Sequence, residues 1–113
     1  MLKPQDRKFQ TYTDGWGTAW KVSDRIMKEV RQQIIHYDEY SVGLNRYWKA
    51  YVEDVQIKKM ILVPEPTQII EGDVFVDSDG TQYEVGQVDR KDTRPVSKLV
   101  TLKSATVNYR RQT

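Results

Sequence analysis

The 113-residue chain contains no cysteine and a single histidine, His36. Without cysteine it can form neither a disulfide nor a thiolate metal site, and it has no thiol nucleophile. One imidazole makes a histidine-rich metal cage or a histidine-based catalytic triad hard to assemble. The six glycines are dispersed and never take the spacing of a phosphate-binding or dinucleotide-binding loop. These absences predict a protein that is not an enzyme and has no catalytic, cofactor-binding or metal-ligating residues.

Long apolar runs are also missing. The longest, residues 60–63 (MILV), is far shorter than the roughly 20 residues that span a bilayer. The first residues, MLKPQD, lack the apolar core of a secretory signal peptide. We therefore expect an intracellular protein with no membrane partner and no small-molecule substrate.

The residues that are present describe one small folded domain. Aromatic residues make up 11% of the chain, which argues against disorder. A chain of this length buries about 60–70% of its unfolded surface, enough for a single modest core. We expect one domain over residues 1–113, with flexible ends at residues 1–8 and 105–113.

Charge is unevenly distributed along the chain. The net charge is +2, but it divides into +3 over residues 1–36, −3 over residues 37–73 and +2 over residues 74–113. An acidic middle between basic ends can favour head-to-tail association of copies. The same blocks are also compatible with a mixed, solvated surface.

The second half of the chain has the pattern of short β-strands. Apolar and polar residues alternate over residues 55–63, and Pro64 ends this first segment. Residues 73–76 and 81–85 lie on either side of a DSDG turn. Residues 96–102 form a fourth stretch with apolar residues on one face. At Gly86 the alternation slips by one, which predicts a β-bulge. Residues 89–95 are expected to form a polar loop.

The first half is more ambiguous. Residues 9–13 and 18–22 flank DGWG, which predicts a hairpin. Ile26, Val30 and Ile34 recur every fourth residue, a spacing that fits either a helix or one face of a strand. Residues 44–51 carry apolar side chains at helical spacing, which predicts a short helix between strands. The expected fold is mainly β: a small β-barrel or sandwich of short antiparallel strands with one short inserted helix.

Aromatic and basic residues alternate in that inserted segment. Tyr47, Trp48 and Tyr51, interleaved with Arg46 and Lys49, could form a stacking platform for single-stranded nucleic acid. Their helical spacing is equally that of a core-facing stripe, so both interpretations stay open.

The motifs and their order resemble a known family. Residues 40–50 (YSVGLNRYWKA) resemble the T/S-V-G-x-x-R-aromatic-aromatic-x-A element of head-closure proteins of long-tailed bacteriophages. These proteins are also called stoppers or head–tail connector proteins, and are often grouped with minor capsid proteins. Residues 12–15, 57–64, 71–76, 82–85 and 99–102 are similar to the segments that flank this element in the family.

The resemblance implies a structural virion protein, assembled in the host cytoplasm. It would form a homo-oligomeric ring under the portal and adaptor, help to retain the packaged double-stranded DNA and dock the tail. A tail-completion protein and a single-stranded nucleic-acid-binding module are the alternatives. The expected interface residues are Arg46, Tyr47, Trp48, Tyr51, Pro64, Glu65 and Pro66. Arg90, Lys91 and Arg94 are expected to face the DNA channel and to contact phosphates without sequence specificity.

Overall fold

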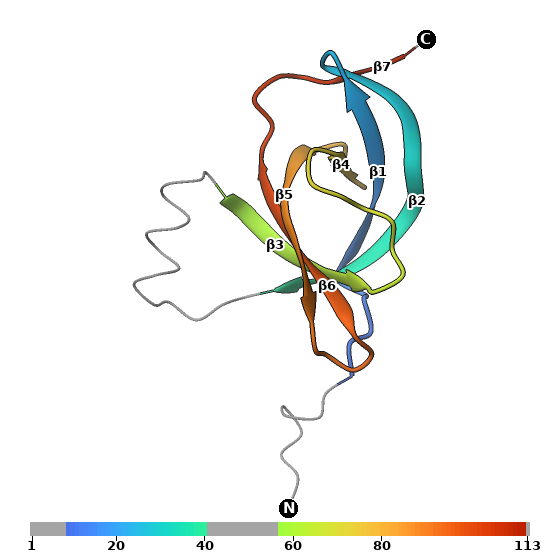
Figure 1. Cartoon of the computed structure of the whole chain (residues 1–113), viewed down its shortest axis with the longest axis vertical. Coiled ribbons are helices and arrows are strands. Elements are labelled where there is room, and N and C mark those ends of the chain that lie inside the picture. The colour runs from blue at the N-terminus through green and yellow to red at the C-terminus, as the bar shows by residue number, and fades with distance from the viewer. Residues whose placement is uncertain (1–8, 41–56, 113) are drawn as a thin grey trace, which may run out of the picture.

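A computed structural model describes residues 9–40 and 57–112 of the chain, and these residues contain seven β-strands and no helix (Figure 1). The strands are β1 (Gly15–Ser23), β2 (Ile26–Tyr40), β3 (Ile57–Pro64), β4 (Val74–Asp77), β5 (Gln82–Lys91), β6 (Ser97–Ser104) and β7 (Arg110–Arg111). The predicted mainly β fold is confirmed. The predicted short helix over residues 44–51 lies outside the described residues.

The first six strands form a closed ring. Their order in the sheet is β1–β4–β5–β6–β3–β2, and β1 also pairs with β2, so the two ends of the sheet meet. All of these pairings are antiparallel. The short strand β7 adds to β2 in parallel, outside the ring. This closed arrangement leaves one core inside and one curved outer face, as the barrel-or-sandwich prediction requires.

The first hairpin lies elsewhere than predicted. Its turn is at Asp24 and Arg25, which both have positive φ angles (53° and 64°), and β1 and β2 pair on either side of it. The predicted DGWG turn is wrong, because Gly15 and Gly17 lie within β1. A Cβ atom at Gly15 would lie 2.5 Å from the ring of Tyr37, and one at Gly17 would collide with Phe75. These glycines therefore allow close packing and do not form a turn.

Residues 26–40 form a strand, which settles the ambiguity left by their periodicity. The residues with fourfold spacing, Ile26, Val30 and Ile34, are only partly buried or exposed, whereas Met27 and Ile35 belong to the core. The pairing of β2 with β1 slips at three points. Each slip places an extra residue in β2, which makes this long strand bend around the core.

The second half of the chain follows the predicted strand order. Gly80 has a φ of 91° in the turn between β4 and β5, and the β5–β6 register slips between Val85 and Val88, which confirms the bulge at Gly86. The predicted polar loop is too long, because β5 continues to Lys91, whose partner in β6 is Ser97. Pairing with β6 extends β5 through polar residues that have no apolar alternation of their own.

The core is a single apolar cluster inside the ring. Ile69, from the loop between β3 and β4, is buried among side chains of the strands. Its members are Ala19, Ile35, Tyr37, Ile61, Val63, Ile69, Phe75, Val85, Val100 and Leu102. Every strand of the ring contributes to it, so the strands stabilise one another through one shared interior.

The C-terminal segment, expected to be a flexible end, is placed against β5 and β2. The side-chain amide of Gln82 exchanges two hydrogen bonds of 2.8 Å with the backbone of Tyr109. The carboxylate of Glu84 accepts bonds from the backbone and hydroxyl of Thr106 and from the Tyr109 hydroxyl. Arg110 and Arg111 then pair with the start of β2.

Candidate functional site

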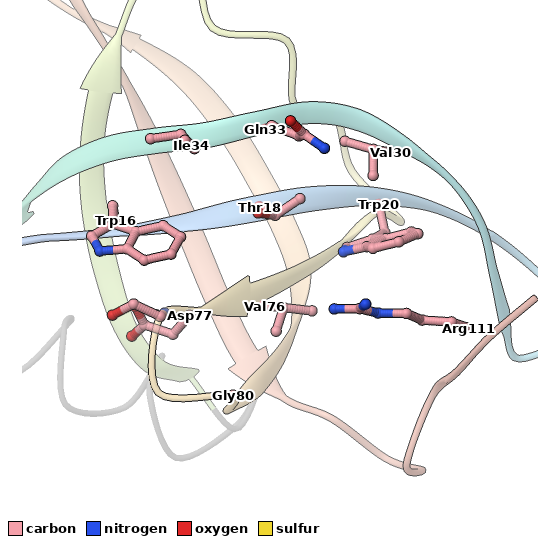
Figure 2. A pocket seen from close by; sticks show the side chains of 11 residues that line it. Trp16, Thr18, Trp20, Val30, Gln33, Ile34, Val76, Asp77, Gly80 and Arg111 are labelled. Atoms are coloured by element: carbon pink, nitrogen blue, oxygen red, sulfur yellow. The ribbon is translucent and has the colours of Figure 1, made fainter.

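A groove of about 400 Å³ crosses the outer face of β1, β2 and β4. Figure 2 shows Trp16 and Trp20 on β1, Val30 and Ile34 on β2 and Val76 on β4 lining it. Trp16 is 44% exposed and Ile34 is 57% exposed. Solvent-exposed apolar side chains of this size, gathered in one concavity, are typical of a contact surface for another molecule.

A distortion of β2 exposes Ile34. Gly17 pairs with Ile35 and Ala19 with Gln32, so Gln33 and Ile34 together lie opposite Thr18 in a β-bulge. Ile34 has a φ of 49°, a left-handed conformation that is an outlier for a β-branched residue. Such backbone strain costs of order 1–3 kcal/mol and is concentrated at functional sites. The bulge therefore marks this face as the leading candidate site.

Arg111 supplies the cation of the groove. Its guanidinium lies 5.1 Å from the Trp20 ring centroid, in a cation–π contact, and Figure 2 shows it extending beneath Trp20 toward Val76. Within residues 9–40 and 57–112, Arg111 has no ion-pair partner. The groove thus combines apolar surface with an unpaired cation, an arrangement that suits a protein segment carrying a carboxylate.

The Glu84 contacts that hold Arg111 in place can be tested directly. Burial alone would raise the pKa of Glu84, but the hydrogen bonds from Thr106 and Tyr109 outweigh it and hold the pKa below the ordinary 4.5. We expect Glu84→Gln to loosen residues 106–111, which increases amide exchange there and acrylamide quenching of Trp20. Acid should loosen the same residues. The stabilisation from the ionised Glu84 carboxylate is present above pH 4.5 and is lost as the pH falls through the lowered pKa of Glu84 in the folded protein.

The control for this prediction is Glu29→Gln, which removes only an exposed ion pair with Lys21. Hydrogen-exchange protection of the amides of residues 106 and 109, compared between the two variants, is the measurement. Equal protection in both variants would show that Glu84 does not fasten the C-terminal segment.

A second polar cluster is centred on Lys59. Lys59 donates hydrogen bonds to Tyr37 (3.1 Å) and Asp77 (3.0 Å), and Tyr37 donates to the same carboxylate at 3.0 Å. Lys59 also lies over the rings of Tyr37 and Tyr83, at 4.9 and 5.2 Å. Its partners come from β2, β4 and β5 and satisfy its polar head, so the cluster joins four strands of the ring.

Two observations concern the polar side chains in the part of the chain that the structure describes. There, no three histidine or carboxylate side chains gather as a metal site requires. No buried side-chain nitrogen or oxygen lacks a hydrogen-bond partner in that part either. His36 lies exposed on β2.

The residues predicted for the interface fall in two places. Pro64 ends β3 opposite Ser97, and Glu65 and Pro66 follow it as exposed residues of the loop to β4. Arg46, Tyr47, Trp48 and Tyr51 lie outside the described residues. Of the predicted interface residues, the structure therefore describes only Pro64, Glu65 and Pro66.

The residues predicted for the DNA channel gather at the β5–β6 turn. Arg90 forms an ion pair with Asp92 at 3.5 Å, and Lys91 lies over the Tyr40 ring at 5.1 Å. The backbone carbonyl of Arg94 accepts a hydrogen bond from Gln10. Two of the three cations already have local contacts, and the DNA-facing role stays a prediction.

Sequence reasoning missed the groove. Trp16, Thr18 and Trp20 alternate with Gly17 and Ala19, which is the pattern of a strand with an aromatic outer face, but DGWG was interpreted as a turn. Arg111 is separated from Trp20 by most of the chain, so no local signal links them.

Comparison with protein-family models, curated proteins and solved structures finds no match to this chain. Among the described residues, no helix meets the length and apolarity that crossing a membrane demands.

Proposed function

We propose that this chain is a structural protein of the head–tail interface of a long-tailed bacteriophage. It assembles as a ring under the portal and adaptor, helps to retain packaged DNA and offers a docking surface for the tail. Its function is to hold other virion components through its outer surface.

The observation that carries the proposal is the position of the family-like segments in the fold. Residues 57–64, 71–76, 82–85 and 99–102 fall on or at the start of β3, β4, β5 and β6, four strands of one closed ring. The order that resembles head-closure proteins is thus also the order in which this small domain is built. The outer groove supports the same reading, because exposed tryptophan at a concave surface is a common element of protein interfaces.

The test is binding to the connector. Purified chain is mixed with portal and adaptor rings from the same virus and analysed by size-exclusion chromatography with light scattering. We expect the chain to co-elute with the connector in several copies per ring. Absence of binding to every connector component would contradict the proposal. Binding to the isolated tail alone would favour a tail-completion protein, and Trp quenching by oligonucleotides at low salt would favour the nucleic-acid alternative.

A further inference from the structure

A further exposed apolar residue belongs to a loop that does not line the groove. Ile70, in the loop between β3 and β4, is 51% exposed, and Glu71 beside it is also exposed. Neither lines the groove formed by Trp16, Ile34 and Arg111. One protomer therefore carries a groove and, separately, an apolar projection next to a carboxylate.

The loop holds Ile70 in a defined position. Ile69 before it is buried in the core, and the carboxylate of Asp73 accepts the backbone N–H of Ile70 at 3.1 Å. Arg31 on β2 donates to the same carboxylate at 2.6 Å, and Gln32 accepts the backbone N–H of Gln68 at 2.7 Å. An exposed residue fixed in this way loses little conformational entropy when it binds, which favours its use in a contact.

The charges of the two surfaces are complementary. Glu71 has no ion-pair partner in the described ranges, and the same is true of Arg111 at the groove. An apolar side chain followed by a carboxylate matches a groove that ends at a guanidinium. The groove also borders Asp77 and Ser78, and aliphatic Val30, Ile34 and Val76 line it, which disfavours a phosphate backbone as its occupant.

We propose that Ile70 and Glu71 of one copy bind the Trp16–Ile34–Arg111 groove of the next copy. Ile70 packs against Trp16 and Ile34, and the Glu71 carboxylate pairs with the Arg111 guanidinium. Because the two surfaces differ, the contact is head-to-tail, and repeated rotation can close it into a ring. The inference rests on the proposed function, since it names the contact that builds the ring.

The absence of cysteine makes a directional cross-linking test possible. Ser78 borders the groove on the β4 side, Gln68 lies near Ile70 beside β2, and both residues are exposed. Ser78→Cys and Gln68→Cys are introduced singly and together, and each protein is treated at high concentration with a short bismaleimide. The double variant should give a ladder of covalent oligomers, and an equimolar mixture of the two single variants should give dimers only. Each single variant alone should remain monomeric.

A ladder from the double variant supports the head-to-tail contact. Monomer in all samples would overturn it, and so would dimers without higher species, because a twofold interface stops at two copies. Dimers from Ser78→Cys alone would also contradict it, since they would place two grooves face to face.

Charge reversal gives a second, independent test of the Glu71–Arg111 pair. In the double-cysteine background, Glu71→Arg or Arg111→Glu should reduce the ladder about threefold or more, and the two reversals together should restore it. Arg110→Glu, at the neighbouring exposed position of β7, is the matched control and should leave the ladder unchanged. Equal loss in Arg110→Glu, or no rescue in the combined reversal, would refute the Glu71–Arg111 pair.

The outcome is separable from that of the connector experiment, because cross-linking uses the purified chain alone. A ladder without connector binding would support the proposed contact between copies and contradict the proposed phage role. Connector binding without a ladder would support the phage role but show that the copies contact one another, or the connector, through other surfaces.

Discussion

Replacing Gly17 by alanine is expected to lower the free energy of unfolding by about 1–3 kcal/mol or more, the usual cost of overpacking a core. A Cβ atom at this position would collide with the Phe75 ring and lie 2.6 Å from the backbone carbonyl oxygen of Val76. Phe75 is fully buried and the carbonyl belongs to β4, so neither can move without separating β1 from β4. The groove should be damaged as well, because both strands form its floor.

Gly86→Ala is the matched control for this prediction. The nearest atoms to a Cβ there lie 3.5 Å away, which is ordinary van der Waals contact. Urea denaturation followed by Trp fluorescence should give Gly86→Ala a free energy of unfolding within about 1 kcal/mol of the parent, because Gly86 does not have the positive φ that disfavours alanine. Equal midpoints for the two glycine variants would show that β1 and β4 are not packed as described.

Loss of the Asp77 carboxylate is expected to be the second large effect. In Asp77→Ala, Lys59 and the Tyr37 hydroxyl lose their shared acceptor. Lys59 keeps its hydrogen bond to Tyr37 but has, as its remaining ion pair, only the longer contact with Glu39 at 3.7 Å. Leaving a partly buried charge without its partner costs roughly 1–3 kcal/mol. Thermal or urea unfolding measures this loss. Asp92→Ala, which removes an exposed ion pair with Arg90, should cost less than about 1 kcal/mol.

The same cluster predicts instability at alkaline pH. Burial alone would lower the pKa of Lys59, but the hydrogen bonds to Tyr37 and Asp77 outweigh it and raise the pKa above the ordinary 10.5. Burial raises the pKa of Tyr37 above 10.0. The folded protein therefore binds both protons more tightly than the unfolded chain does. The stabilisation from protonated Lys59 and Tyr37 is fully present below pH 10. It is lost as the pH rises through the raised pKa values of these two groups in the folded protein.

Substitution of Lys59 separates this cluster from a general alkaline effect. In Lys59→Met, the decline of the unfolding free energy above pH 10 should be shallower than in the parent, because the lysine contribution is gone. An identical slope in the two proteins would mean that the Lys59 cluster is not the source of the pH dependence.

Local signals in the sequence predicted the order of strands β3 to β6, although not the extension of β5 to Lys91. The turn before Gly80 requires a positive φ that glycine adopts readily, and the bulge at Gly86 shifts the alternation of the residues around it. Both features are fixed by neighbouring residues. They could therefore be predicted without knowledge of the strand partners.

The first half depends on contacts between distant residues. Ile26, Val30 and Ile34 fit a helix and a strand equally well, and it is pairing with β1 that makes residues 26–40 a strand. The candidate site could not be predicted from the sequence for the same reason. Trp20 and Arg111 meet only because β7 pairs with the start of β2, and the exposure of Ile34 arises from slips in register.

Under the proposed function, this groove and this projecting loop act through repetition of the chain. The groove of one copy offers a small apolar surface and the guanidinium of Arg111, which are weak contacts alone. Copies joined head to tail would multiply each contact around the ring, and the connector would hold them at a high effective concentration. In the proposed ring, the left-handed backbone at Ile34 would keep an apolar side chain exposed for a neighbour.

Electron microscopy of the chain mixed with portal–adaptor connectors tests the structural role most directly. Averaged images should show one additional ring of several copies, stacked coaxially at the end of the connector that receives the tail. Connectors without added density, or with single copies attached at scattered positions, would contradict the role of the chain as a ring-forming component of the head–tail interface.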